Sequence, residues 1–122
     1  MKHLLLKKLI KKILINHNLN NEHAETCANA LINAELVGAP SHGLSRLRMY
    51  CERISKKVIN PKPKIKIKKI SQSISHIDAD NSIGFVAADT AIKVGIKNAK
   101  KTGIGLVAVK NSGHYGLSGY YA

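Results

Sequence analysis

The sequence predicts an α/β fold, in which an amino-terminal helical segment is followed by the start of a mixed or parallel sheet with a crossover helix. Three observations lead to this fold class. Apolar residues recur at helical spacing in three segments before residue 58. Isoleucines then alternate in part with lysine and serine, as in strands. A further helical pattern and a short apolar run follow, which is the order of a parallel crossover unit.

The first helix is expected over about residues 1–15, with apolar residues on one side and lysine pairs on the other. The apolar positions are Leu5, Leu6, Leu9, Ile10, Ile13 and Leu14. A membrane-surface helix would show this pattern, but a helix of a globular domain with a solvated basic face is the more common case.

A second helix begins at Asn20 or Asn21, either of which can cap it. Gly38 and Pro40 supply the expected signals for its end. Between these limits runs a stripe of small apolar residues, namely Ala24, Cys27, Ala28, Leu31 and Ala34. The stripe is the apolar side of the expected helix.

A third helix is expected over about residues 43–57, with Ser41 as its N-cap. One face of this helix is apolar and consists of Leu44, Leu47, Cys51 and Ile54. Four polar residues project within about 80° of one another on a different face, namely His42, Arg46, Tyr50 and Arg53. We expect the polar stripe to stay accessible. It could bind a carboxylate through the planar fork of an arginine, although solvated stripes of this kind are common on surface helices.

Pro61 and Pro63 interrupt the helical pattern. They divide the chain into a helical segment, 1–60, and the beginning of an α/β unit, 61–122. Alternating isoleucines after this break predict two short strands with a turn near residues 71–72.

Residues 78–81 are expected to form a turn and a capping region, and a helix follows over about residues 84–101, ending at Gly103. Residues 104–109 are expected to form a strand that is buried on both faces, and a glycine-rich loop over 111–119 follows it. One crossover leaves the other strands of such a sheet unaccounted for. We therefore expect the chain to be truncated.

The composition argues against several classes of protein. Twenty Lys and Arg against seven Asp and Glu give a formal charge of +13, but the excess is lysine and accompanies many isoleucines and asparagines. Because the sequence has no arginine-rich patch and no aromatic residues between its basic ones, a small nucleic-acid-binding protein is the weaker alternative. No stretch is long and apolar enough for a membrane span or a signal peptide. Cys27 and Cys51 suit reduced core thiols, so a soluble, cytoplasmic protein is expected.

His114 is the candidate with the strongest sequence context for catalysis. It follows a predicted strand directly, where open α/β sheets tend to bind ligands, and glycines flank its segment. Its ordinary pKa suits proton exchange with an alcohol near neutral pH, although a hydrogen-bonded turn histidine is an equally simple interpretation. The other histidines have no zinc spacing, so we predict no metal. No dinucleotide fingerprint or phosphate-binding loop is present, so spacing alone supports no nucleotide site.

Taken together, these segments resemble the malate/L-lactate dehydrogenase family, which is distinct from the Rossmann-fold lactate and malate dehydrogenases. The resemblance rests on AELVG at 34–38, SHG at 41–43 with Arg46 and Tyr50, ID at 77–78, SIG at 82–84, GIGLV at 103–107 and NSGHYG at 111–116. Order and spacing hold over nearly all of the chain, which makes the match specific, whereas a single SHG motif would mean nothing.

The resemblance implies an oxidoreductase that transfers a hydride between NAD or NADP and a small 2-hydroxy or 2-oxo acid such as malate, lactate, ureidoglycolate, sulfolactate or diketogulonate. It implies that His114 is the catalytic acid/base, with Arg46 as the carboxylate clamp of a substrate-binding group. The other members of that group are Ser41, His42 and Tyr50.

The resemblance further implies a homo-oligomer, a dimer, in the full-length form. Family members are much longer, and most of their cofactor contacts lie beyond the position matching Ala122. We therefore expect an amino-terminal portion that is inactive by itself. The alternative is a non-catalytic remnant that binds a partner or a homologous subunit.

Overall fold

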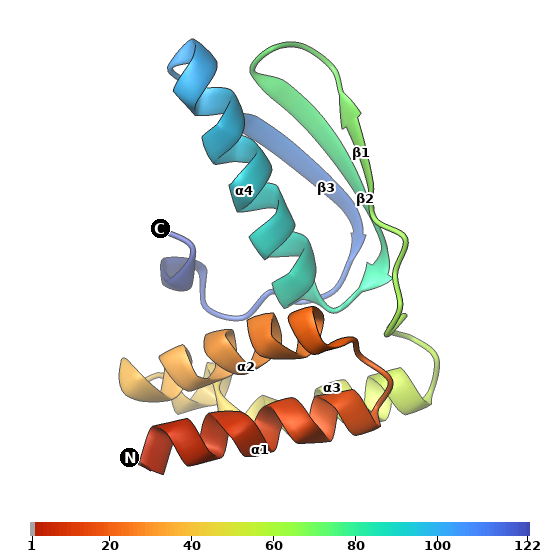
Figure 1. Cartoon of the computed structure of the whole chain (residues 1–122), viewed down its shortest axis with the longest axis vertical. Helices are drawn as coiled ribbons and strands as arrows, with labels where there is room; N and C mark the ends of the chain where they lie inside the picture. The colour runs from red at the N-terminus through yellow and green to blue at the C-terminus, as the bar shows by residue number, and fades with distance from the viewer. Residues whose placement is uncertain (1) are drawn as a thin grey trace.

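The computed structural model describes residues 2–122 as a helical layer with a small sheet and one long helix above it (Figure 1). The helical layer contains α1 (Lys2–Asn16), α2 (Asn21–Leu36), two short 3₁₀ turns, η1 (Pro40–His42) and η2 (Leu44–Arg46), and α3 (Leu47–Ser55). The second part contains β1 (Lys66–Lys69), β2 (Ile74–Ser82), α4 (Gly84–Thr102), β3 (Leu106–Ser112) and the 3₁₀ turn η3 (Ser118–Tyr120). The predicted α/β class is confirmed.

The small-residue stripe of α2 forms the centre of the core. All five of its predicted residues are buried, and the cluster around them includes Ile10 and Leu14 of α1 and Phe85 and Val86 of α4. Small side chains let the neighbouring helices approach closely. Asn20 caps the helix, because its side-chain oxygen accepts a hydrogen bond from His23 N–H at 2.7 Å.

The apolar face of α1 is narrower than predicted. Leu5 and Leu9 are exposed, while Leu6 and Ile13 are only partly buried. α1 packs against α2 along one side only, so the outer part of its apolar stripe has no neighbour within residues 2–122. The first residue of the predicted helix lies outside the described residues.

The third predicted helix is shorter than expected, and Ser41 does not cap it. α3 begins at Leu47, after η1 and η2, and the side chain of its N-cap residue, Arg46, makes no capping hydrogen bond to the helix. The backbone N–H of Leu44 donates instead to the Glu35 carboxylate of α2. A carboxylate from another helix thus accepts the hydrogen bond from a backbone N–H at the start of η2. The Ser41 hydroxyl contacts His42 instead.

The sheet is mixed, with the order β1-β2-β3. β1 pairs antiparallel with β2 through a turn at residues 70–73, and β2 pairs parallel with β3. α4 makes the crossover between the parallel strands and ends at Gly103, whose φ of +83° is the left-handed cap that glycine favours. The predicted hairpin and the parallel crossover are therefore confirmed.

The prediction of a turn and cap at residues 78–81 is wrong, because this segment belongs to β2. Asp80 and Asn81 have φ values of 51° and 55°, and the pairing with β3 is irregular between Asp78 and Ser82. The Asp80 carboxylate accepts hydrogen bonds from Lys64 N–H and the Asn60 side chain, which holds the segment after α3 against the strand. Local turn conformations therefore occur inside a strand.

β3 is not buried on both faces as predicted. Leu106 is 59% exposed and Val109 is 38% exposed. β3 is an edge strand of the sheet that residues 2–122 form, and α4 covers one face of it only. The apolar composition of a strand therefore indicates that it can be buried. The elements that pack against the strand decide whether it is buried.

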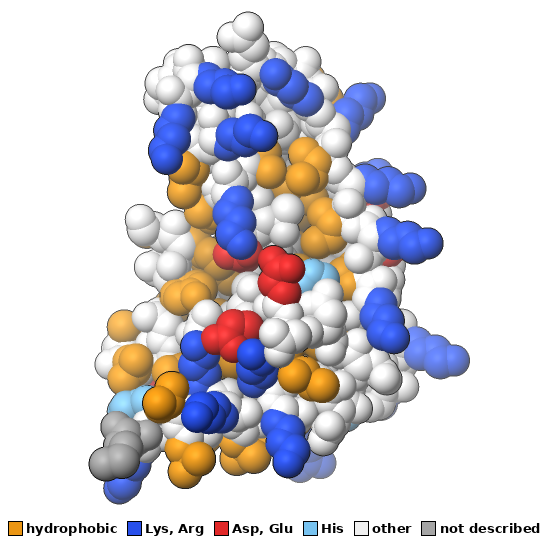
Figure 2. Space-filling view, viewed as in Figure 1, with side chains coloured by type: hydrophobic (Ala, Val, Ile, Leu, Met, Phe, Trp, Pro, Cys, Tyr) orange, Lys and Arg blue, Asp and Glu red, His pale blue; other side chains and the backbone are white. Residues whose placement is uncertain are grey.

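Charge is spread over the surface. Figure 2 shows Lys and Arg side chains distributed from one end of the molecule to the other, with hydrophobic patches between them. None of the helices within residues 2–122 has the length and apolar character needed to cross a membrane. The division of the chain into a helical segment, 1–60, and an α/β unit, 61–122, stays a prediction.

The core predicts the cost of truncating a buried leucine. Leu31→Ala should lower the free energy of unfolding by about 2–5 kcal/mol, because Leu31 is fully buried and its loss leaves a cavity. Leu36→Ala, on the same helix at a 59% exposed position, should change it by less than about 0.5 kcal/mol. Urea unfolding of both variants measures the difference. Equal losses would contradict this description of the core.

Candidate active site

His114 lies in the loop that follows β3, at the end of the strand where the sequence places it. Its Nδ1 atom has two neighbours. Gly116 N–H donates a hydrogen bond to it at 3.1 Å, and Tyr50 Oη lies 3.3 Å away. The loop after β3 therefore contacts α3, and residues far apart in the sequence lie together here.

Two glycines bring this loop against α4. A side chain at Gly84 would overlap the backbone carbonyl of His114, so the first turn of α4 packs directly on the loop. Gly116 has a φ of +82°, and a side chain there would overlap the ring of Phe85. Figure 1 shows the loop passing between the start of α4 and the helical layer. The position of His114 is therefore set by close backbone packing.

A second segment of the site is the turn formed by η1 and η2. Ser41 Oγ lies 3.0 Å from His42 Nδ1, and Arg46 Nε donates to the Ser41 carbonyl at 2.7 Å. This bond uses one of the five N–H donors of the guanidinium group. The turn thus holds Ser41, His42 and Arg46 together.

Glu35 fastens this turn to α2. Its carboxylate accepts the hydrogen bond from Leu44 N–H at 2.7 Å, and it lies so close to Gly43 that a side chain at that position would overlap it. Glu35, Gly84 and Phe85 all help to shape the site, although the sequence predicted no role there for them. No local pattern could have identified Glu35, because its partner belongs to a separate turn.

The structure brings the two predicted groups together. The ring centroids of His42 and His114 are 5.9 Å apart, so the η1–η2 turn and the loop after β3 face one another. Tyr50 connects with this pair, but it is 1% exposed and packs edge-on against Phe85 with ring centroids 5.1 Å apart. The expectation of an accessible polar stripe is therefore wrong for Tyr50. Arg53 is exposed, as predicted.

The surroundings of His114 favour its neutral form. Partial desolvation of the imidazole lowers the pKa of His114, and the charges of Arg46 and Arg53, together with that of His42 when it is protonated, lower it further. Burial raises the pKa of Tyr50 to about 12, so its hydroxyl is protonated at neutral pH. The site thus combines a neutral imidazole and a phenol with a nearby guanidinium group.

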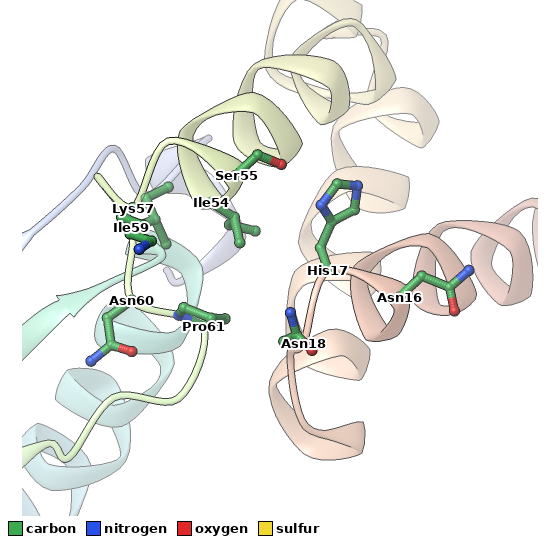
Figure 3. A pocket seen from close by; sticks show the side chains of 9 residues that line it. All are labelled: Asn16, His17, Asn18, Ile54, Ser55, Lys57, Ile59, Asn60 and Pro61. Atoms are coloured by element: carbon green, nitrogen blue, oxygen red, sulfur yellow. The ribbon is translucent and has the colours of Figure 1, made fainter.

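Two cavities differ in their relation to this site. One of about 460 Å³ lies between α4, β3 and the loop, and its lining includes Gly84, Gly113 and Tyr115, so it adjoins His114. Another of about 620 Å³ lies where the ends of α1 and α3 meet residues 57–61 (Figure 3). It is lined by Asn16, His17, Asn18, Ile54, Ser55, Lys57, Ile59, Asn60 and Pro61 and includes no predicted site residue.

In the part of the chain that the structure describes, no three His, Cys, Asp or Glu side chains lie close enough to hold a metal ion together. His114 has an amide and a phenol as its neighbours, which suits proton exchange.

Comparison with known proteins gives matches along the whole chain. The family model described as malate/L-lactate dehydrogenase matches residues 1–122. L-sulfolactate dehydrogenase from Methanocaldococcus jannaschii is 40% identical over 95% of this chain and 34% of its own length. Malate dehydrogenase from Pyrococcus abyssi is 42% identical over 93% of this chain and 31% of its own length.

The fold has the same relatives. The structure of malate dehydrogenase from Pyrococcus horikoshii matches with a TM-score of 0.93 and 39% identity, over 96% of this chain and 34% of that one. The chain therefore spans about a third of the length of the relatives it matches.

The electrostatics of the site predict the effect of removing a charge. Arg46→Gln should raise the pKa of His114, because it removes a positive charge that disfavours the imidazolium form. An NMR titration of the His114 ring protons measures the shift. Arg48→Gln is the matched control, since Arg48 pairs with Glu52 instead. A His114 pKa that rises no more in Arg46→Gln than in Arg48→Gln would refute this account.

The packing of the loop predicts a second effect. Gly84→Ala should lower the free energy of unfolding by about 1–3 kcal/mol, because the added methyl group overlaps the His114 carbonyl. Gly119→Ala, where nothing lies within 4 Å of the added atom, should cost less than about 1 kcal/mol. Thermal unfolding compares the two variants. A Gly84→Ala protein as stable as Gly119→Ala would show that the contact does not hold the loop.

Proposed function

The chain belongs to the malate/L-lactate dehydrogenase family, and from this premise we propose that it is the substrate-binding and acid/base portion of an oxidoreductase. The reaction is hydride transfer between NAD or NADP and a small 2-hydroxy or 2-oxo acid of the malate or lactate type. Its named relatives act on malate and on sulfolactate, which are both small 2-hydroxy acids with an additional acidic group.

The observation that carries this proposal is the approach of the η1–η2 turn to His114. A guanidinium group on one side and an imidazole on the other suit the two functional groups of a 2-hydroxy acid, its carboxylate and its hydroxyl. Arg46 binds the carboxylate, with donors from Ser41 and His42. Tyr50 belongs to the same group through its hydroxyl, the part of the side chain that contacts His114.

The proton and the hydride follow separate paths. When the hydroxy acid is oxidised, the hydroxyl proton passes to His114 while C2 loses a hydride, and the 2-oxo acid is the product. In the reverse direction the imidazolium form of His114 returns the proton to the oxygen. The lowered pKa of His114 keeps the neutral form available for the oxidation.

A bound nicotinamide cofactor would supply the hydride acceptor or donor. The cavity that adjoins His114 fits the ring end of such a cofactor, because its lining is largely apolar and includes Ala88, Ile92 and Tyr115. We further propose that the cofactor is NAD or NADP. The longer form is proposed to be a homodimer, and the protein to lie in the cytoplasm. Two unpaired cysteines within residues 2–122, Cys27 and Cys51, support the reducing location.

A second candidate is a non-catalytic portion that binds a partner or a homologous subunit. Exposed apolar residues on α1 and β3, among them Leu5, Leu9 and Leu106, favour it. The two candidates differ in cofactor binding. Saturable binding of NADH or NADPH to the chain, followed by nicotinamide fluorescence, supports the oxidoreductase, and its absence supports the second candidate.

Substrate binding tests the role of the turn. Titration of the chain with L-malate or L-lactate should shift the NMR signals of residues in the η1–η2 turn and in the loop after β3. These shifts should saturate as the acid is added. Arg46→Gln should weaken this binding by about tenfold or more, because a charge-assisted hydrogen bond to the carboxylate is lost. Arg48→Gln should leave it unchanged. Equal affinities in the two variants would remove Arg46 from the proposed site.

Turnover tests the role of His114. In any preparation of this chain that oxidises a 2-hydroxy acid, His114→Ala should lower kcat by about 10²–10⁴-fold, which is the usual contribution of a general acid or base. The formation of NADH, followed by absorbance, measures the rate. Normal turnover in His114→Ala would exclude this residue as the acid/base.

A further inference from the structure

The Nδ1 atom of His114 has two neighbours with different chemistry. The backbone N–H of Gly116, at 3.1 Å, can only donate a hydrogen bond. The hydroxyl of Tyr50, at 3.3 Å, can either donate or accept one. The Gly116 contact therefore admits only a ring with a free lone pair on Nδ1, whereas the Tyr50 contact admits either state.

The Gly116 bond favours a neutral ring with its proton on Nε2, because Nδ1 must then offer a lone pair. In that tautomer Nε2 already carries a proton and cannot take one from a substrate. A ring that accepts a proton at Nε2 must carry its own proton on Nδ1. Nδ1–H then needs an acceptor, and Gly116 N–H cannot be one.

Tyr50 is placed to be this acceptor. Its ring is buried and packs edge-on against Phe85, so the position of its hydroxyl is set by the core. Within residues 2–122, no carboxylate is among the groups whose charge acts on the pKa of His114, which are Arg46, His42 and Arg53, so the acceptor here is an uncharged phenol. Burial raises the pKa of Tyr50 to about 12, and the phenol thus keeps both of its hydrogen-bonding modes near neutral pH.

We propose that Tyr50 is a positioning residue that selects the tautomer of His114: its hydroxyl oxygen accepts Nδ1–H and leaves Nε2 able to exchange a proton with the substrate. When the Gly116 bond forms, as it does in this structure, it already uses the single lone pair of Nδ1, so this state depends less on the hydroxyl. The proposal rests on the acid/base role of His114 proposed above. The tautomer itself, however, is a property of this chain without substrate or cofactor.

Nitrogen-15 NMR of the histidine-labelled chain tests the proposal, because long-range proton–nitrogen spectra distinguish Nδ1–H from Nε2–H rings. At a pH well above the His114 pKa, the wild-type chain should populate both tautomers. Tyr50→Phe should lower the ratio of the Nδ1–H to the Nε2–H form by about five- to tenfold, the effect of losing one hydrogen bond. Tyr121→Phe is the control, since its hydroxyl donates to the Tyr115 carbonyl.

Several outcomes would overturn the assignment. One is a tautomer ratio in Tyr50→Phe equal to that in Tyr121→Phe. Should Tyr50→Phe fail to fold, the wild-type spectrum decides by itself, because a ring found only in the Nε2–H form would exclude Tyr50 as the acceptor. A chain that shows the expected ratios but binds no 2-hydroxy acid would contradict the proposed function and leave the role of Tyr50 intact.

Discussion

The close approach of Gly84 to the backbone of His114 is the constraint on which the arrangement of the site depends. α4 begins at this glycine, and the two residues after it, Phe85 and Val86, belong to the core of the helical layer. A single contact thus joins the end of β2, the start of the crossover helix and the loop after β3. Because backbone lies against backbone there, the loop takes its position from the core although His114 itself is exposed.

The charges around His114 connect substrate binding with proton transfer. Partial desolvation and the positive charge nearby hold the pKa of His114 below its ordinary value. A carboxylate bound at Arg46, as proposed, would bring negative charge close to the imidazole and offset part of this effect. The same guanidinium group that binds the anion would then also adjust the proton affinity of the base.

Local sequence patterns predicted most of the helices and strands. They failed where contacts with other parts of the chain determine burial or conformation. The small-residue stripe of α2 is buried as predicted, because α1 and α4 both pack against it. The stripe of α1 and the apolar run of β3 are partly exposed, since a repeat shows which side of an element is apolar and not what covers it. The turn conformations of Asp80 and Asn81 lie within a strand because hydrogen bonds to residues 60–64 hold them there.

The sequence by itself determined the α/β class, the hairpin, the parallel crossover and the residues that resemble a dehydrogenase site, because spacing and turn residues act over short stretches of chain. Only the tertiary structure decided how these residues meet. Tyr50 and His114 are 64 positions apart, and Glu35 reaches a turn that belongs to a different element. Such contacts depend on how helices and loops pack, and no local periodicity records that. Helical spacing predicted that Tyr50 lies on an accessible polar face, whereas packing buries the residue and places its hydroxyl next to Nδ1 of His114.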